Sequence, residues 1–202
     1  LPPVNQLHPH PHPTSSKRKE NPMTTLATKT RRKCFISYHH ADEIEVAQFI
    51  QTFDHNQDVL IARGIGARMP GDIINSTNDG YIMRKIRENY LRDTSVTIVL
   101  IGKETWKRKF VDWEIAASLS NTTQIVASGL AAITLPSAAD YYDKRLPDRL
   151  NDNWNEGNGY ATWWKYPSSA DRLAEIIETA YSDRCLKADL IDNRRPLRQR
   201  NA

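Results

Sequence analysis

The amino-acid sequence predicts a single α/β domain, with a five-stranded, mainly parallel β-sheet and helices on both faces. Short apolar runs alternate along the chain with segments whose apolar residues recur at helical spacing. The run 95–101 is apolar on both faces, as expected for the central strand of a parallel sheet. The length of 202 residues fits one such domain with extensions. We expect the strand order 2-1-3-4-5, with 95–101 in the centre.

The first half of the domain contains two short strands and two helices before the central strand. Residues 34–38 form an apolar strand, and Asp42 then caps a helix that reaches about Phe53. The second strand, 59–62, leads into a long loop in which Pro70-Gly71 signals a turn. Apolar residues at helical spacing predict the second helix from Tyr81 to Leu91.

The second half repeats the alternation after the central strand. Residues 111–119 are expected to be helical, and 125–135 contain a fourth strand. Residues 136–159 are rich in Asp, Asn, Pro and Gly, so we interpret them as a long polar loop. A short strand at 161–164 and an amphipathic helix over 168–181 complete the domain.

Charge divides the chain into three parts. Residues 1–32 carry a net charge of +5, residues 184–202 a net charge of +4, and residues 33–183 a net charge of −5. The first part also holds six of the 11 prolines and a His-Pro alternation, so we expect a disordered, basic Pro/His-rich extension. The organisation predicted is therefore an extension (1–32), a domain (33–183) and a basic C-terminal tail (184–202). The acidic body offers no nucleic-acid recognition element, so nucleic acid is an unlikely partner.

Composition excludes several classes of protein. No apolar run approaches the ~18 residues that a membrane span requires, and residues 1–32 lack the apolar core of a secretory signal. Two cysteines, Cys34 and Cys185, cannot build a disulfide framework or a four-ligand zinc site. We therefore expect a cytoplasmic protein with reduced thiols and no membrane partner.

Ligands of such sheets bind beyond the carboxyl ends of the strands, near the switch in strand order. Gly64-Ile65-Gly66 follows the second strand but lacks the third glycine and the helix of a dinucleotide fingerprint. His39 and His40 lie just past the first strand, where they are either polar residues at a helix start or part of a substrate-contacting loop. No spacing supplies a third metal ligand, so no metal site is expected.

The stretch 106–115 is the richest in side chains that carry chemistry, with basic residues beside Trp106 and Trp113. Val111 and Ile115 would face the core, and Glu114 lies on a different face near the helix start. Glu114 is thus either a surface helix residue that the helix dipole stabilises or a functional carboxylate. The basic and aromatic neighbours would suit a phosphate-bearing aromatic ligand.

Three ordered motifs resemble the TIR-like domain family over roughly residues 33–182. They are Lys33-Cys34-Phe35-Ile36-Ser37-Tyr38-His39, the run 95–102 that ends in Gly102, and Thr105-Trp106 followed by Trp113-Glu114-Ile115. The closest likeness is to the Thoeris TIR-like (ThsB) proteins of bacterial antiphage defence. The resemblance implies a flavodoxin-like fold, the same class that the periodicity indicates.

The resemblance also implies an activity. Catalytic members cleave NAD at the nicotinamide–ribose bond, and Thoeris members make a cyclic ADP-ribose-type messenger that activates a partner effector. By the resemblance, Glu114 is the catalytic residue and NAD is a substrate, with no cofactor. The residues implied to bind substrate are Phe35, Ser37, His39, His40, Arg63 and Trp113.

An alternative remains open, because many TIR domains act only as adaptors that assemble with other TIR domains. In that case the chain would keep the fold and its self-association surfaces but would not turn over NAD. The presence of Glu114 after the Trp-containing loop favours the enzyme.

Overall fold

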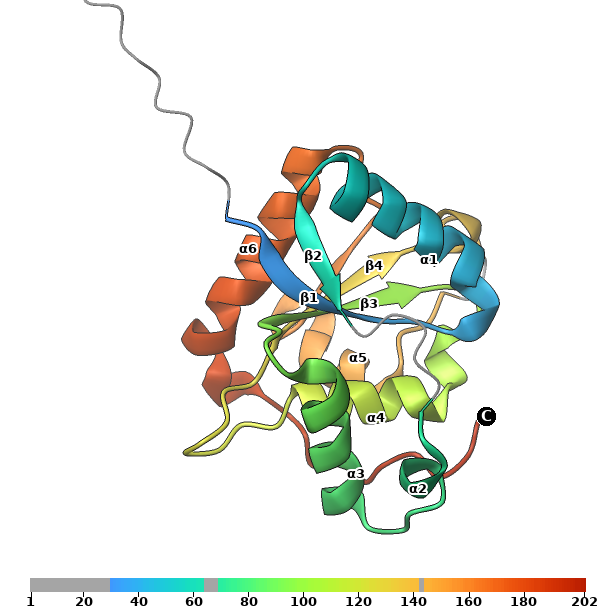
Figure 1. The fold of residues 1–202 in the computed structure, drawn as a ribbon, viewed down its shortest axis with the longest axis vertical. Helices are drawn as coiled ribbons and strands as arrows, with labels where there is room; N and C mark the ends of the chain where they lie inside the picture. Colours follow the sequence, from blue (N-terminus) through green and yellow to red (C-terminus); the bar gives the residue numbers. More distant parts are fainter. Residues whose placement is uncertain (1–29, 64–68, 142–143) are drawn as a thin grey trace, which may run out of the picture.

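A computed structural model describes residues 30–63, 69–141 and 144–202, and it shows a five-stranded parallel sheet between two layers of helices (Figure 1). The strand order is β2-β1-β3-β4-β5, and all four neighbouring pairs are parallel. This confirms the predicted order and the central position of β3. The strands are β1 (Arg32–Ser37), β2 (Leu60–Arg63), β3 (Val96–Ile101), β4 (Gly129–Thr134) and β5 (Thr162–Trp164).

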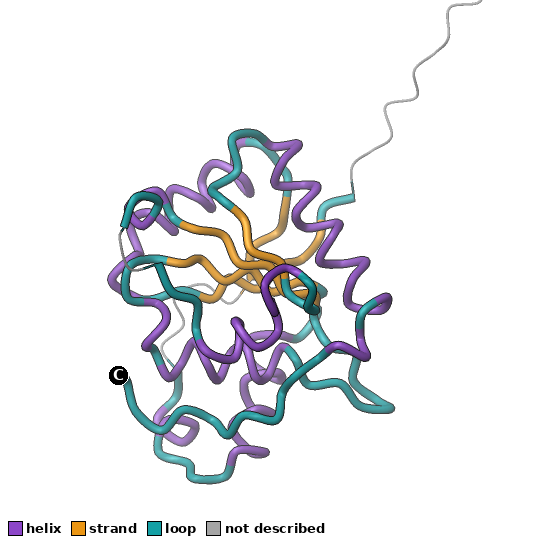
Figure 2. Tube along the Cα trace, turned by 180° about the vertical axis from the view of Figure 1, so that it is seen from behind, coloured by secondary structure: helices purple, strands orange, loops and turns teal. Residues whose placement is uncertain are grey.

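The helices cover both faces of the sheet, as Figure 2 shows from behind. They are α1 (Glu43–Ile50), α2 (Gly71–Ile74), α3 (Asp79–Ile86), α4 (Lys109–Ser118), α5 (Asp148–Trp154) and α6 (Ala170–Leu186). Short helical turns are η1 (His40–Asp42), η2 (Gln51–Asn56), η3 (Arg87–Leu91), η4 (Thr105–Lys107), η5 (Pro136–Ala138), η6 (Asn155–Gly157) and η7 (Ala188–Leu190). Helices α1 and α6 pack on one face, and α3, α4 and α5 pack on the other.

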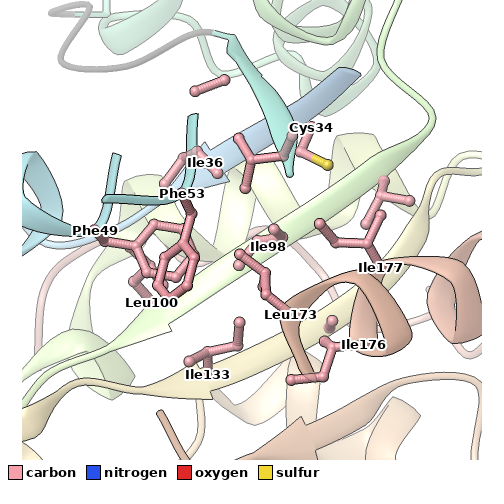
Figure 3. Close-up of a cluster of buried hydrophobic side chains, with 14 of the residues drawn as sticks. Cys34, Ile36, Phe49, Phe53, Ile98, Leu100, Ile133, Leu173, Ile176 and Ile177 are labelled. Carbon is pink, nitrogen blue, oxygen red and sulfur yellow. The ribbon is translucent and has the colours of Figure 1, made fainter. Parts of the chain in front are cut away.

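The core under α1 and α6 is almost entirely aliphatic and aromatic (Figure 3). Phe49 and Phe53 come from α1 and η2, and Leu173 and Ile177 come from α6. They meet every second residue of β1, β3 and β4, because successive side chains of a strand point to opposite faces. Burial of this apolar surface is the main contribution to the stability of the layer.

The opposite face carries polar groups at its centre. The alternation along β1 turns Phe35 and Ser37 toward the α3 and α4 layer, while Cys34 and Ile36 face α1 and α6. On β3, the Thr97 hydroxyl is hydrogen-bonded to that of Ser118 in α4 at 2.7 Å. Helix α4 thus contacts the sheet through hydroxyl groups as well as through Val111 and Ile115.

Two predicted loops contain helices. Helix α2 begins directly after Pro70, which therefore starts a helix and does not form a turn. Helix α5 lies within the stretch interpreted as a polar loop. The sequence does not indicate this helix because its buried residues include the polar Arg149 and Asn153. Asp42 occupies the N-cap position of α1, but its side chain makes no capping hydrogen bond.

The predicted domain limits also differ from the structure. Arg32 belongs to β1, and its guanidinium is bound to the Glu178 carboxylate at 2.8 Å and lies over the Tyr181 ring. At the other end, α6 runs through the predicted boundary at 184. Residues 191–202, which we call the C-terminal segment, pack against the domain, with Leu197 buried beside Phe35 and Trp113.

Arg149 in α5 joins α4 to the C-terminal segment. Its guanidinium donates to both carboxylate oxygens of Asp112, at 3.0 and 3.3 Å, to Asn193 Oδ1 at 2.8 Å and to the Pro196 carbonyl at 3.0 Å. Both charged side chains are at most 5% exposed.

Among the helices within the described residues, none is long and apolar enough to cross a membrane.

We predict that Arg149→Met lowers the free energy of unfolding by about 3–5 kcal/mol, because the Asp112 carboxylate would remain buried without its partner. Arg195→Met is the matched control, since Arg195 binds Asp152 in a partly exposed pair whose loss costs about 1 kcal/mol or less. Urea denaturation of both variants measures the difference. Equal costs would show that burial of the Arg149 pair has no energetic consequence.

Candidate active site

The candidate site lies where β1 ends and α4 begins to cross the sheet. Ser37, the last residue of β1, is buried, and its hydroxyl donates to Glu114 Oε2 at 2.6 Å. Glu114 and Ser118 are one turn apart on α4, so both face the sheet, Ser118 toward Thr97 and Glu114 toward Ser37. The alternative in which Glu114 is a surface helix residue is therefore wrong, because its side chain is largely covered.

Burial changes the acidity of this carboxyl group. Desolvation raises the pKa of Glu114 to about 7, and the hydrogen bond from Ser37 acts in the opposite direction. The group therefore changes charge near neutral pH, unlike an ordinary glutamate. Perturbed acids of this kind are typical of functional sites.

Two tyrosines lie within electrostatic reach of Glu114, and the sequence analysis did not single them out. Tyr38 follows Ser37, and Tyr90 lies in η3 with its ring 6.5 Å from the ring of Phe35. Burial first, and then nearby carboxylates including Glu114, raise the pKa of both phenols. Glu114 therefore lies within electrostatic reach of two neutral hydroxyl groups.

Phe35 and Trp113 lie beneath the site and not on its surface. They are 1% and 2% exposed and share one core cluster with residues of α3 and with Leu197. The indole Nε1 of Trp113 donates to the carbonyl of Arg198 at 2.8 Å. These two rings are thus in position to support α4 and β1, and neither presents a free face for stacking.

The C-terminal segment also holds the first turn of α4. The amide of Lys109 donates to Asn201 Oδ1 at 3.0 Å, which gives the helix a cap from a residue far along the chain. The amide of Arg198 donates to Asp112 Oδ2 at 2.9 Å. The turn that precedes Glu114 is therefore fixed from outside as well as by its own hydrogen bonds.

The two predicted histidines occupy different environments. His39 is half-buried, and burial, followed by the charge of Arg108, lowers its pKa, so it is neutral at neutral pH. His40 is exposed, and its Nδ1 lies 3.4 Å from Glu43 Oε2. Arg108, at the N-cap position of α4, donates to Glu104 at 2.9 Å and adds a cation beside His39 that the sequence analysis did not assign.

Arg63 is exposed at the end of β2, where it is paired in register with Phe35 of β1. It is therefore at the carboxyl edge of the sheet, where Ser37 also lies, one strand away. The Gly64-Ile65-Gly66 motif that follows lies outside the described residues.

Asp42 organises the loop after β3. The Thr105 hydroxyl donates to Asp42 Oδ2 at 3.4 Å and accepts the amide hydrogen of Gly102 at 2.9 Å. A side chain at position 102 would collide with the Asp42 carboxylate, which explains the glycine. The loops after β1 and β3 are thereby joined at the switch in strand order, the place where such sheets bind ligands.

No group of three or more His, Cys, Asp or Glu side chains is arranged to hold a metal ion among the residues described. The chemistry available is thus one carboxyl group of raised pKa, a serine hydroxyl, two phenols, a neutral imidazole and an arginine.

Comparison with known proteins gives one informative result. The family model described as Thoeris protein ThsB, TIR-like domain, matches residues 35–139, just over half of the chain. The match includes Ser37, Arg108 and Glu114 and confirms the resemblance inferred from the sequence motifs. No curated protein matches the chain.

We predict that Glu114→Gln changes the pH dependence of stability. Because the folded protein raises the pKa of Glu114, the group contributes most to the free energy of unfolding when it is protonated. That contribution is complete below the ordinary pKa of 4.5 and is lost as the pH rises through about 7. Relative to the wild type, the variant should gain about 2–3 kcal/mol between pH 5 and pH 8 in urea denaturation. The exposed Glu88→Gln should run parallel to the wild type, and parallel curves for Glu114→Gln would contradict the prediction.

Proposed function

The chain belongs to the Thoeris ThsB TIR-like family, and we propose that it cleaves NAD at the nicotinamide–ribose bond to make a cyclic ADP-ribose-type signal. Membership of this family implies a role in antiphage defence. The observation that carries the enzymatic proposal is the contact between Ser37 and Glu114 at the carboxyl edge of the sheet. It holds a single carboxyl group, with an elevated pKa, at the place where α/β sheets bind nucleotides.

The chemistry needs one well-placed carboxylate. When the bond between ribose C1′ and the nicotinamide nitrogen breaks, the electron pair leaves with neutral nicotinamide and the ribose becomes an oxocarbenium-like cation. An anionic Glu114 stabilises that cation. Water, or a nitrogen of the adenine in the same NAD molecule, then attacks the cation at C1′ and loses a proton. Nicotinamide leaves without a general acid because it is cationic in NAD, so the partner carboxyl of ordinary glycosidases is unnecessary.

The raised pKa of Glu114 supports this role. A carboxylate that is poorly solvated in the free protein gains more from an approaching positive charge than one that water already stabilises. The nicotinamide–ribose cation is such a charge, and its binding would favour the ionised form of Glu114. Ser37 then keeps one carboxylate oxygen in place while the other remains available to the ribose.

Other contacts follow from charge and position. We assign the pyrophosphate of NAD to Arg63 and Arg108. Arg63 is the last residue of β2, and Arg108 lies in the connection after β3; these two strands flank β1. His39, neutral and half-buried, is placed as a hydrogen-bonding partner, and His40 as a peripheral contact. Phe35 and Trp113 support the floor of the site through packing.

The rival proposal is a TIR-like module that assembles with other TIR domains and does not turn over NAD. It requires no carboxyl group of raised pKa beneath the site. Mass spectrometry of the nucleotides after incubation of the full chain with NAD separates the two proposals, because only the enzyme releases nicotinamide.

We predict that Glu114→Gln lowers the rate of NAD consumption about 10²–10³-fold, the usual effect of removing one preorganised electrostatic contact. Near-UV circular dichroism should remain that of the wild type. Glu88→Gln, an exposed carboxylate that binds Lys85, is the control and should retain full activity. A wild type proven active, with a Glu114→Gln variant equal to it in turnover, would exclude the assignment.

We predict that Ser37→Ala moves the pH–rate profile to higher pH. Loss of the hydroxyl raises the pKa of Glu114 further, so half-maximal turnover should require a pH about 1–2 units higher. Ser118→Ala removes a buried serine from the same face of α4 without touching the carboxyl group, and it should leave the profile unchanged. Identical shifts in both variants would mean that the effect comes from general loosening of α4.

A further inference from the structure

A separate hollow lies beyond the carboxyl ends of β4 and β5, and its volume is about 580 Å³. This size suits a drug-sized or nucleotide-sized ligand. Its lining consists of Thr134, Ala139, Asp140, Lys144, Trp163, Trp164, Lys165 and Tyr166. Neither Ser37 nor Glu114 is among them, and β3 separates β4 from β1, which carries Ser37. The hollow is therefore distinct from the candidate active site.

The two indoles of the hollow are held by neighbouring groups. Trp163 donates from Nε1 to the Thr134 hydroxyl at 2.9 Å, and its ring meets Trp154 edge-on at 5.4 Å between centroids. Trp164 carries the Arg172 guanidinium at 4.6 Å from its ring centroid. Both indoles are half-buried, and they pack toward opposite faces of the sheet, Trp163 toward α4 and α5 and Trp164 toward α1 and α6. Trp163 is the ring on the side of Thr134, and it has a fixed position while part of the ring stays exposed. Fixed aromatic rings of this kind stack with nucleobases.

The charge of the hollow favours an anion. Lys144 and Lys165 are exposed at its rim, and neither forms an ion pair with another described residue. Asp140 is the single carboxylate of the lining, so the lining carries a net positive charge. Two ammonium groups without an ion-pair partner among the described residues, beside a fixed indole, fit a flat aromatic group that bears phosphate.

We propose that this hollow is a second binding site, for a nucleoside phosphate, with the base against Trp163 and the phosphate at Lys144 and Lys165. The proposal does not depend on NAD cleavage, because it concerns other residues and requires no reaction.

ADP is a suitable probe, since it has a base and two phosphates but no nicotinamide–ribose bond. We expect saturable binding in isothermal titration calorimetry with the full chain. Substitution of both lysines (Lys144→Glu and Lys165→Glu) should weaken it at least tenfold, and Trp163→Ala should weaken it as well. Lys33→Glu, the same charge change at the opposite, amino end of β1, is the matched control and should bind as the wild type does. Adenosine should bind more weakly than ADP, and added salt should weaken ADP binding.

The indole N–H signals locate the ligand independently of affinity. The chain has five tryptophans, so ¹⁵N spectra assigned with Trp→Phe variants should show ADP shifting the signals of Trp163 and Trp164 and leaving that of Trp113 in place. Absence of saturable binding up to about 10 mM ADP would overturn the proposal. So would binding that Glu114→Gln or Ser37→Ala abolishes while the double lysine variant retains it, because the ligand would then occupy the active site. A failure of NAD turnover changes none of these outcomes.

Discussion

The buried ion pair between Arg149 and Asp112 is the contact on which the arrangement of the site depends. One guanidinium joins a carboxylate of α4, an amide oxygen of Asn193 and a carbonyl of Pro196. Charges are costly to bury, so such a group is stable only when its partners are all present. The pair therefore makes α4, α5 and the C-terminal segment one unit, and α4 is the helix that carries Glu114.

Two carboxyl groups, two residues apart on α4, show how the environment of an acid determines its charge. Asp112 accepts two hydrogen bonds from Arg149 and one from the backbone of Arg198, so its charge is compensated on all sides. Glu114 is covered, and within the described residues the hydroxyl of Ser37 is the one hydrogen-bond donor to its carboxylate. The same helix thus holds one carboxylate as a structural anchor and leaves the other in an environment that disfavours its charge.

The sheet could be predicted from the sequence because its signals are local. Runs such as 95–101 are apolar at every position, and alternation with helical spacing determines the class of fold. Glu114 and Ser37 could be found only through the motifs that resemble the family, since periodicity alone assigns Glu114 to an outer face. Helix α5 was missed because it is buried through Arg149 and Asn153, whose partners lie about 40 residues later in the chain. Tyr90 gave no signal for the same reason: its relation to Glu114 exists only after α3 and α4 pack together.

The cap that Asn201 places on α4 has a consequence for the order of synthesis. Residues 191–202 leave the ribosome after every strand of the sheet, at the usual ~5–20 residues per second. Until then Lys109 lacks its acceptor, Trp113 lacks the carbonyl of Arg198, and Arg149 lacks two of its four acceptor contacts. The nascent chain can therefore complete its sheet before the C-terminal segment makes its contacts with the helix that bears Glu114. The final arrangement of the site therefore forms late in synthesis and folding, after the strands of the core are available.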